Sequence, residues 1–161
     1  MTPLVAAFLI GAIAGLRTMT PPAFVAWAAR LGLLRLDGTP LSFLGLPVTA
    51  WVFTVLALGE LVADKLPRTP ARTRPGPFVA RIVSGAMSGG AITAGAAGSL
   101  AAGAVLGAIG AVAGTLAGYN ARVRLVPALE VPDTVVALAE DLVAVGGALL
   151  IVAGLNGAAG H

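Results

Sequence analysis

Residues 79–118 read VARIVSGAMSGGAITAGAAGSLAAGAVLGAIGAVAGTLAG and carry a single charge, that of Arg81. As one helix, this stretch would be about 60 Å long at ~1.5 Å per residue, roughly twice the ~30 Å thickness of the hydrocarbon layer of a bilayer. A segment of this kind is typical of a chain that crosses a membrane, turns and crosses back. The stretch therefore predicts two membrane-spanning helices.

The composition of the whole chain agrees with a membrane protein. Its 161 residues are 58% hydrophobic and 11% charged, whereas soluble domains are about 25% charged. The length suits one transmembrane domain, residues 1–161, without a second, soluble one. The absence of cysteine excludes disulfides and thiolate metal sites. The basic residues behind the net charge of +3 cluster in predicted loops, which indicates topology signals and not a nucleic-acid site. We expect membrane lipid as a partner, no nucleic acid and no cofactor.

Six apolar segments are candidates for membrane spans. Thr20 followed by two prolines, Pro47, and Pro132 followed by Asp133 are helix-start signals for the second, third and sixth segments. The run YNARVRL at 119–125 is expected to close the fifth. The first segment lacks the basic start and cleavage site of a signal peptide, so it is predicted to be a retained span. The predicted spans cover residues 3–16, 20–34, 47–66, 79–93, 97–118 and 132–154.

Basic residues indicate the orientation of these spans. Cytoplasmic loops of membrane proteins are enriched in Lys and Arg, and the loop 65–81 contains no acidic residue. Six crossings place Arg17, Arg122 and Arg124 on the same side as this loop and leave both chain ends outside. The basic residues of the loop are Lys65, Arg68, Arg72, Arg74 and Arg81.

The two halves of the chain share a short motif. Residues 10–21, IGAIAGLRTMTP, resemble residues 84–95, SGAMSGGAITAG, at an offset of 74 positions (84 minus 10). Two three-span units, 1–66 and 79–161, joined by the basic, proline-rich cytoplasmic linker 67–78, would be inverted relative to each other, as in many secondary transporters. The predicted fold is an all-α membrane protein of about six helices in a 3+3 inverted repeat, with a short or broken first helix in each half. A chance match between Gly- and Ala-rich helices is the alternative.

Glycines recur on one face of the predicted fifth span. Their spacings of four, three, four and four residues place them along one side of a helix, where small residues let helices approach closely in lipid. Packing within the chain is the favoured interpretation, and a homodimer seam is the alternative. The glycines are Gly103, Gly107, Gly110, Gly114 and Gly118.

Besides Asp133 at the start of the sixth span, four acidic residues fall inside predicted spans, although an ionisable group there costs at least about 2.5–3.5 kcal/mol. Glu60 and Asp64 lie one helical turn apart near the cytoplasmic end of the third span, and Glu140 and Asp141 lie at similar depth in the sixth. Arg17, at the break between the first two spans, reaches the same level. These groups either line a polar cavity that binds a cation or exchanges protons, or form a structural network, for example Arg17 with Glu60.

The candidate binding site gathers the polar groups at this depth. The helix start at Thr20 adds free amides that favour an anion. Glu140 and Asp141 are about 100° apart on a helix, so we expect only one of them to face the centre. The predicted ion- or substrate-binding residues are Arg17, Thr18, Thr20, Glu60, Asp64, Asn120, Glu140 and Asp141, supported by Lys65, Ser84, Ser88 and Arg122.

The sequence favours transport over catalysis. It lacks the phosphate-binding, zinc-protease and serine-hydrolase motifs, and its single histidine is the last residue, so we expect no enzyme, no catalytic residue and no metal site. The leading hypothesis is a small transporter or channel for a small ion or polar solute, coupled to protons through a buried carboxylate. The alternatives are a non-catalytic assembly or accessory protein that packs a partner through the glycine stripe, and a membrane enzyme that acts on lipid.

Three strings of residues together resemble a known family: GLRTMTPP at 15–22, ADKLPRTPART at 63–73 and PDTVVALAED at 132–141. With ARIVSGA at 80–86, they are similar to the bacterial integral membrane family known as domain of unknown function 4126, over nearly the whole chain. The resemblance implies no activity, but it implies a multi-pass protein of the bacterial cytoplasmic (inner) membrane. The family motifs emphasise Arg17, Thr18, Asp64, Lys65, Pro67, Arg68, Arg72, Arg81, Ser84, Gly85, Glu140 and Asp141.

Overall fold

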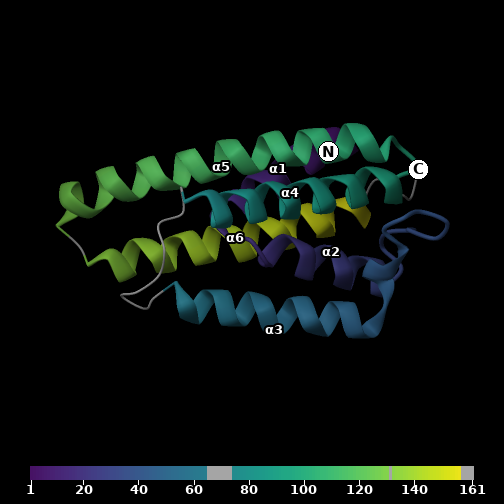
Figure 1. Ribbon diagram of the computed structural model, residues 1–161, viewed down its shortest axis with the longest axis horizontal. Coiled ribbons are helices and arrows are strands. Elements are labelled where there is room, and N and C mark those ends of the chain that lie inside the picture. The colour runs from purple at the N-terminus through teal and green to yellow at the C-terminus, as the bar shows by residue number, and fades with distance from the viewer. Residues whose placement is uncertain (65–73, 131, 157–161) are drawn as a thin grey trace.

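The structure, a computed structural model, describes residues 1–64, 74–130 and 132–156, and folds them into six α-helices and one short 3-10 helix, with no strand. Successive α-helices run in opposite directions between the two ends of the molecule (Figure 1). The all-α prediction is therefore confirmed. The elements are α1 (Pro3–Leu16), α2 (Thr20–Arg30), η1 (Ser42–Gly45), α3 (Pro47–Ala63), α4 (Pro75–Gly95), α5 (Leu100–Leu129) and α6 (Asp133–Asn156).

Most of the helices begin at residues that suit a free helix N-terminus. Each of α1 to α4 has a proline in its first turn, where the missing backbone N–H would have had no helical partner. Thr2 caps α1 by accepting a hydrogen bond from the N–H of Val5, and Ser99 caps α5 by accepting one from Ala102. The helix start predicted at Thr20 is confirmed.

The centre of the fold is a group of three helices whose backbones touch. α5 packs along both α1 and α4, and α1 and α4 also pack on each other. A Cβ on Gly107 of α5 would overlap the carbonyl group of Gly85 in α4, and a Cβ on Gly11 of α1 would overlap Gly107. Only glycine permits this approach, which gives the close van der Waals contact that holds helices together in an apolar surrounding.

The glycine stripe of α5 therefore packs inside the chain. Gly103 faces α4, whereas Gly110 and Gly114 face the backbone of Phe8 and Ala12 in α1. The interpretation of the stripe as internal packing is confirmed. Its surface is occupied by α1 and α4, so these glycines are not available as a seam between two copies of the chain.

The motif shared by the two halves also has a packing role. Gly11 and Gly85, which align at the offset of 74, both contact the backbone of Gly107. α4 is continuous over 21 residues, so the broken first helix predicted for the second half is wrong; its glycines are contact points for α5 and keep helical geometry. α4 begins at Pro75, inside the predicted linker 67–78, whose residues up to 73 lie outside the described part of the chain. The inverted repeat stays a prediction.

Two further helix boundaries differ from the prediction. α2 ends at Arg30, short of residue 34, because Gly32 adopts a positive φ of 77° directly after the helix. α5 continues through 119–125 to Leu129, where the sequence suggests a helix end. Arg122 therefore projects from a helix and can contact α6.

The outer helices α3 and α6 leave a large apolar surface exposed. Ala50 is the one buried residue in α3, while Val48 is 71% exposed and Trp51 is 60% exposed. On α6, Leu142 and Leu150 are more than 70% exposed. Monomeric soluble proteins rarely expose so much contiguous apolar surface, so this face is suited to contact with lipid.

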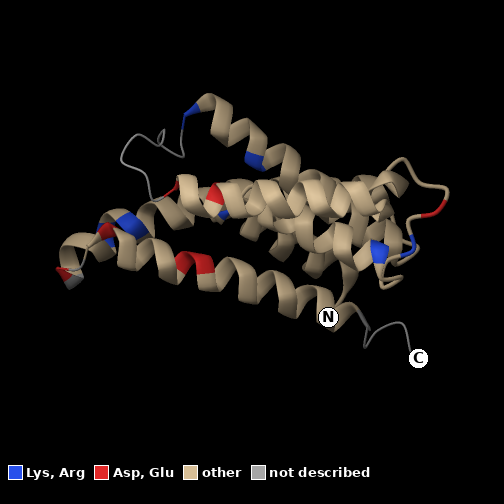
Figure 2. Ribbon diagram, turned by 90° about the horizontal axis from the view of Figure 1, so that it is seen from below, with Lys and Arg blue, Asp and Glu red and all other residues tan. Residues whose placement is uncertain are grey.

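Charged residues lie in one half of the molecule and at its opposite end, and an uncharged band separates the two groups (Figure 2). α5 over Leu100–Ala128 and α6 over Asp133–Leu155 are long and apolar enough to cross a membrane. α1 and α3 are apolar but only 14 and 17 residues long. Helix length and composition thus support two of the six predicted spans in the described residues.

Replacing Gly107 by alanine should destabilise the protein, because the added methyl group would push α1 and α4 away from α5. Overpacking a core typically costs about 1–3 kcal/mol, so we expect a lower apparent melting temperature for the detergent-solubilised protein, measured by size-exclusion chromatography after heating. Gly146→Ala is the matched control, since a Cβ on this helical residue would meet nothing within 4 Å. Equal melting temperatures for the two variants would contradict the packing described for α5.

Candidate functional site

A break of three residues, Arg17, Thr18 and Met19, separates α1 from α2. Arg17 has an extended backbone, with φ −138° and ψ 116°, which takes the chain out of the helix. Its side chain has no exposed surface and is the largest fully buried side chain in the described residues. Because a guanidinium stays charged in proteins, its counter-charges must lie close by.

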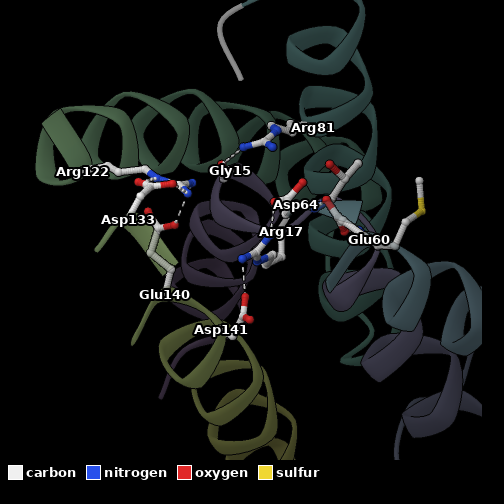
Figure 3. Close-up of polar contacts among 11 residues, drawn as sticks. Gly15, Arg17, Glu60, Asp64, Arg81, Arg122, Asp133, Glu140 and Asp141 are labelled. Carbon is white, nitrogen blue, oxygen red and sulfur yellow. Dashed lines mark hydrogen bonds and ion pairs between the residues drawn. The ribbon is translucent and has the colours of Figure 1, made fainter. Parts of the chain in front are cut away.

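Two carboxylates from different helices neutralise Arg17. Asp64, directly after α3, accepts a hydrogen bond from Nη1, and Asp141, in the first half of α6, forms an ion pair with Nη2 (Figure 3). Both acidic side chains keep 13% of their surface exposed, whereas the Arg17 side chain has none. We call Arg17, Asp64 and Asp141 the Arg17 cluster. Through it, one side chain connects the break to both α3 and α6.

Glu60 binds the backbone at the start of α2. Its two carboxylate oxygens accept hydrogen bonds from the N–H groups of Thr18 and Met19, each at 2.7 Å. These amides lie at the positive end of the α2 dipole, where a negative group is favoured. The ion pair between Arg17 and Glu60 suggested by the sequence is wrong, because Glu60 binds the backbone and Asp64, one turn later, binds Arg17. The helix start does attract an anion, and that anion is a carboxylate of the same chain.

Side chains of α4 and α5 bind the carbonyl groups on the other side of the break. The Gly15 carbonyl accepts a hydrogen bond from Arg81 Nη1 at 2.6 Å and one from the Thr115 hydroxyl at 3.2 Å. The Ser84 hydroxyl donates to the Thr18 carbonyl. A cation suits the negative end of α1, and buried backbone that leaves a helix must find such partners. The break is thus held by opposite charges, Arg81 at the end of α1 and a carboxylate at the start of α2.

A second group of ion pairs joins α5 to α6. Arg122 Nε donates to Asp133 Oδ1 at 2.5 Å, and Arg122 Nη1 lies 3.8 Å from Glu140 Oε2. Glu140 and Asp141 therefore engage different arginines, as their angular separation on the helix requires (Figure 3). Asp141 contacts Arg17 at the break, and Glu140, which is also buried, lies against Arg122 of α5.

The remaining predicted residues do not join the Arg17 cluster. Asn120 is exposed and donates to the Leu116 carbonyl in its own helix, so its predicted place in the site is wrong; α5 continues where a loop was expected. Ser88 is fully buried, and its Oγ has no hydrogen-bond partner in the described residues. Thr20 is buried and lines a separate cavity. Lys65 lies outside the described residues.

Three residues of the site are not among those that the sequence assigned to it. Arg81 has a clear signal, because it is the single charge in the apolar stretch 79–118, and such a charge is expected to be paired. Asp133 has the sequence signal of a helix-start residue, so the sequence does not predict its pairing with Arg122. Thr115 has no sequence signal, since a hydroxyl in an apolar helix commonly bonds one turn back, as it also does here to Ala111 at 2.8 Å.

A cavity of about 490 Å³ lies between α2, α3 and α6. Its lining is almost entirely apolar and includes Thr20 but no member of the Arg17 cluster. It is therefore not the polar cavity that the sequence suggested around the acidic residues. In residues 1–64, 74–130 and 132–156, no group of three or more His, Cys, Asp or Glu is arranged to hold a metal ion.

Removing Arg17 should destabilise the protein far more than removing an exposed arginine. Arg17→Gln leaves Asp64 and Asp141 without their counter-charge, and breaking a buried ion pair costs about 3–5 kcal/mol. Arg124→Gln, at an exposed position of α5, should change stability by less than about 0.5 kcal/mol. Thermal unfolding in mild detergent, followed by circular dichroism, measures both. A melting temperature for Arg17→Gln that matches Arg124→Gln would contradict the burial of an essential charge.

A double variant, Arg17→Gln with Asp141→Asn, tests whether the two side chains interact. Asp141→Asn removes one of the charges that Arg17→Gln leaves uncompensated, so the two changes together should cost less than the sum of the single costs. The same unfolding measurement gives the coupling energy. Strictly additive costs would mean that Arg17 and Asp141 do not interact.

The comparisons with known proteins agree with the resemblance seen in the sequence. The family model described as Domain of unknown function (DUF4126) matches residues 4–154, a range that contains all three residues of the Arg17 cluster. Neither a curated protein nor a solved structure shows a significant match to the chain. Because the family match extends from α1 to the last turn of α6, the chain belongs to the DUF4126 family, a domain of unknown function.

Proposed function

We propose that this protein is a small multi-pass membrane transporter or channel for a small ion or polar solute, and that the Arg17 cluster is its exchange site. The observation that carries the proposal is the fully buried guanidinium of Arg17, shared between carboxylates of two different helices. Ionisable groups within membrane segments are costly and commonly mark ion or proton pathways. Loss of either ion pair would free a helix as well as a binding group.

The membrane part of the proposal is that all six helices are embedded, with α1 and α2 as a hairpin that enters from one side. At ~1.5 Å per residue, α1 and α2 are about 21 Å and 16 Å long, less than the ~30 Å hydrocarbon layer. The break at Arg17 would then lie below the headgroups. Non-helical backbone at such depth is tolerated where protein or a water-filled cavity surrounds it. Arg81, Thr115 and Ser84 donate hydrogen bonds to its carbonyl groups, and Glu60 accepts them from its N–H groups.

The packing suggests which parts of the protein move. α1, α4 and α5 touch through their backbones at glycines, so this group is expected to remain rigid. α3 has one buried residue, and its inner end is attached through Glu60 and Asp64 to the break. α6 is attached at the same level through Asp141. We propose that α3 and α6 move relative to the rigid group when the ion pairs change.

Arg17 and a bound proton or cation compete for the carboxylates, and this competition couples binding to the movement of α3 and α6. The small exposed surfaces of Asp64 and Asp141 give a proton or a metal cation access to the acids, whereas Arg17 itself is sealed. A cation that neutralises Asp141 would release α6 from Arg17 and leave Asp64 as its counter-charge. Because an unpaired buried charge is costly, the occupancy of the acids and the position of the helices cannot vary independently.

The alternative, an assembly protein, requires the glycine stripe of α5 as a surface for a partner. The glycines of α5 contact α1 and α4 within the same chain, so they offer nothing for a partner to pack against. The exposed apolar surfaces of α3 and α6 could still contact another protein, but they equally suit lipid. Transport remains the proposal that uses the buried charges.

Flux into proteoliposomes tests the proposal. The probe is a pH-sensitive dye enclosed in vesicles that contain the purified protein, with gradients of Na⁺, K⁺, Cl⁻ or phosphate applied across the membrane. We expect at least one gradient to change the internal pH faster than in protein-free vesicles. Asp141→Asn should bring the rate down to the protein-free value, because the exchangeable carboxylate is lost.

The control variant is Asp37→Asn, which removes an exposed carboxylate from the connection between α2 and α3 and should leave the flux unchanged. Size-exclusion profiles before reconstitution verify that each variant is folded. Folded wild-type protein that moves none of these ions, or an Asp141→Asn variant with full flux, would overturn the proposal.

A further inference from the structure

The apolar cavity between α2, α3 and α6 has the form of a groove along α2. Its lining extends from Thr20 at the first turn of α2 to Leu31 just after its last turn. At ~1.5 Å per residue, these eleven steps span about 16 Å, close to half of the ~30 Å hydrocarbon layer. Half of that layer is the depth occupied by one acyl chain of a phospholipid. The groove therefore has the length of a single lipid tail.

The groove requires no water. Trp27 and Thr54 carry polar groups into its lining, but the Trp27 indole N–H donates to the Thr54 hydroxyl at 2.9 Å, and this hydroxyl donates to the Ala50 carbonyl at 2.8 Å. The other residues of the lining, apart from Thr20, are apolar. A hydrocarbon chain in this space would bury the apolar lining and keep it out of contact with water.

The groove opens toward the proposed lipid phase. α2 packs on both α3 and α6, whereas α3 and α6 make little contact with each other. Leu58 of α3 and Leu149 of α6 both line the groove and are more than half exposed, which places its opening between these two helices. A lipid tail could enter sideways through this opening without disturbing the Arg17 cluster.

Positive charge lies at one end of the groove. Arg30 immediately precedes Leu31, which lines the groove, and Arg35 follows two residues after Leu33, which also lines it. Both arginines are exposed, and neither has an ion-pair partner in the described residues. A phosphate group attached to a tail in the groove would find its counter-charge there.

We propose that the groove between α2, α3 and α6 binds one acyl chain of an anionic phospholipid, with the phosphate held at Arg30 and Arg35. The lipid fills the gap between α3 and α6 and supports α2 from the side opposite the glycine-packed group. This inference rests on the membrane part of the proposed function but does not depend on ion transport. A protein that transports nothing could still bind the lipid.

Trp27 is the reporter of the groove, and Trp51 is replaced in the samples that use it, because the two rings are in edge contact with their centroids 5.3 Å apart. Trp27 lines the groove, and Trp51 is 60% exposed on α3. Trp51→Phe leaves Trp27 as the single reporter, and Trp27→Phe leaves Trp51. Each variant is reconstituted in phosphatidylcholine vesicles with an increasing fraction of phosphatidylglycerol brominated on its acyl chains, which quenches tryptophan on contact.

In the Trp51→Phe variant, Trp27 should be quenched at a lower fraction of brominated phosphatidylglycerol than of brominated phosphatidylcholine, by about threefold, the effect expected of one exposed ion pair. Arg30→Gln should remove this preference, and Ala57→Leu, which fills the groove, should protect Trp27 from both lipids. Gly59→Ala is the control for a change in α3 where a Cβ meets nothing within 4 Å.

The outcomes distinguish the two proposals. Equal quenching of Trp27 by the two brominated lipids would overturn the lipid groove and leave the membrane part intact, as would equal quenching of Trp27 with and without Ala57→Leu. If neither tryptophan is quenched, the helices are not embedded in lipid and both proposals fail. Loss of ion flux in Asp141→Asn with unchanged quenching of Trp27 would support both.

Discussion

The complete burial of the Arg17 guanidinium is the constraint on which the arrangement of the outer helices depends. A permanent charge without solvent contact must keep its counter-charges within bonding distance. Asp64 and Asp141 supply them from α3 and α6, and Glu60 and Arg81 bind the backbone on either side of the same break. The polar contacts of α3, α4, α5 and α6 therefore converge on the break between α1 and α2 and on Gly15 just before it.

The protein combines two kinds of packing. α1, α4 and α5 are held by direct contact between backbones, which leaves no space for adjustment at positions such as Gly107. The remaining helices cover less surface, and their inner ends are joined to this group by charges. Close packing between backbones resists any movement of one helix against another, whereas an ion pair can be released by a single proton or cation. This contrast is the physical basis for assigning movement to α3 and α6.

Much of this arrangement follows from the sequence, and the part that does not has identifiable causes. The apolar stretch 79–118, the glycine periodicity and the level of the acidic residues predict the helical fold, the internal stripe and the meeting of Arg17 with Asp64 and Asp141. The partner of each charge was not predictable, because Glu60 and Asp64 lie on the same face and only the exact position of α3 decides which one meets the guanidinium.

The chain leaves the helix after α1 but stays helical through α4. The sequence does not predict this difference, for a related reason. Both segments carry the same glycine motif, but Gly11 lies five residues before the end of its helix, whereas Gly85 lies in the middle of α4. Composition alone does not distinguish a glycine that packs from one that permits a turn. The continuation of α5 past residue 118 was missed because a run of polar residues resembles a helix end, although on a long helix it can project toward α6.

The distance between α3 and α6 with and without Arg17 tests the central claim most directly. The chain has no cysteine, so spin labels at Val62→Cys and Leu138→Cys, two exposed positions on these helices, give one defined pair for electron–electron double resonance in lipid. A narrow distance distribution that broadens or lengthens in Arg17→Gln is the predicted result, while a label pair at Val83 and Leu116 on α4 and α5 keeps its distribution. Identical Val62–Leu138 distributions with and without Arg17 would contradict the account.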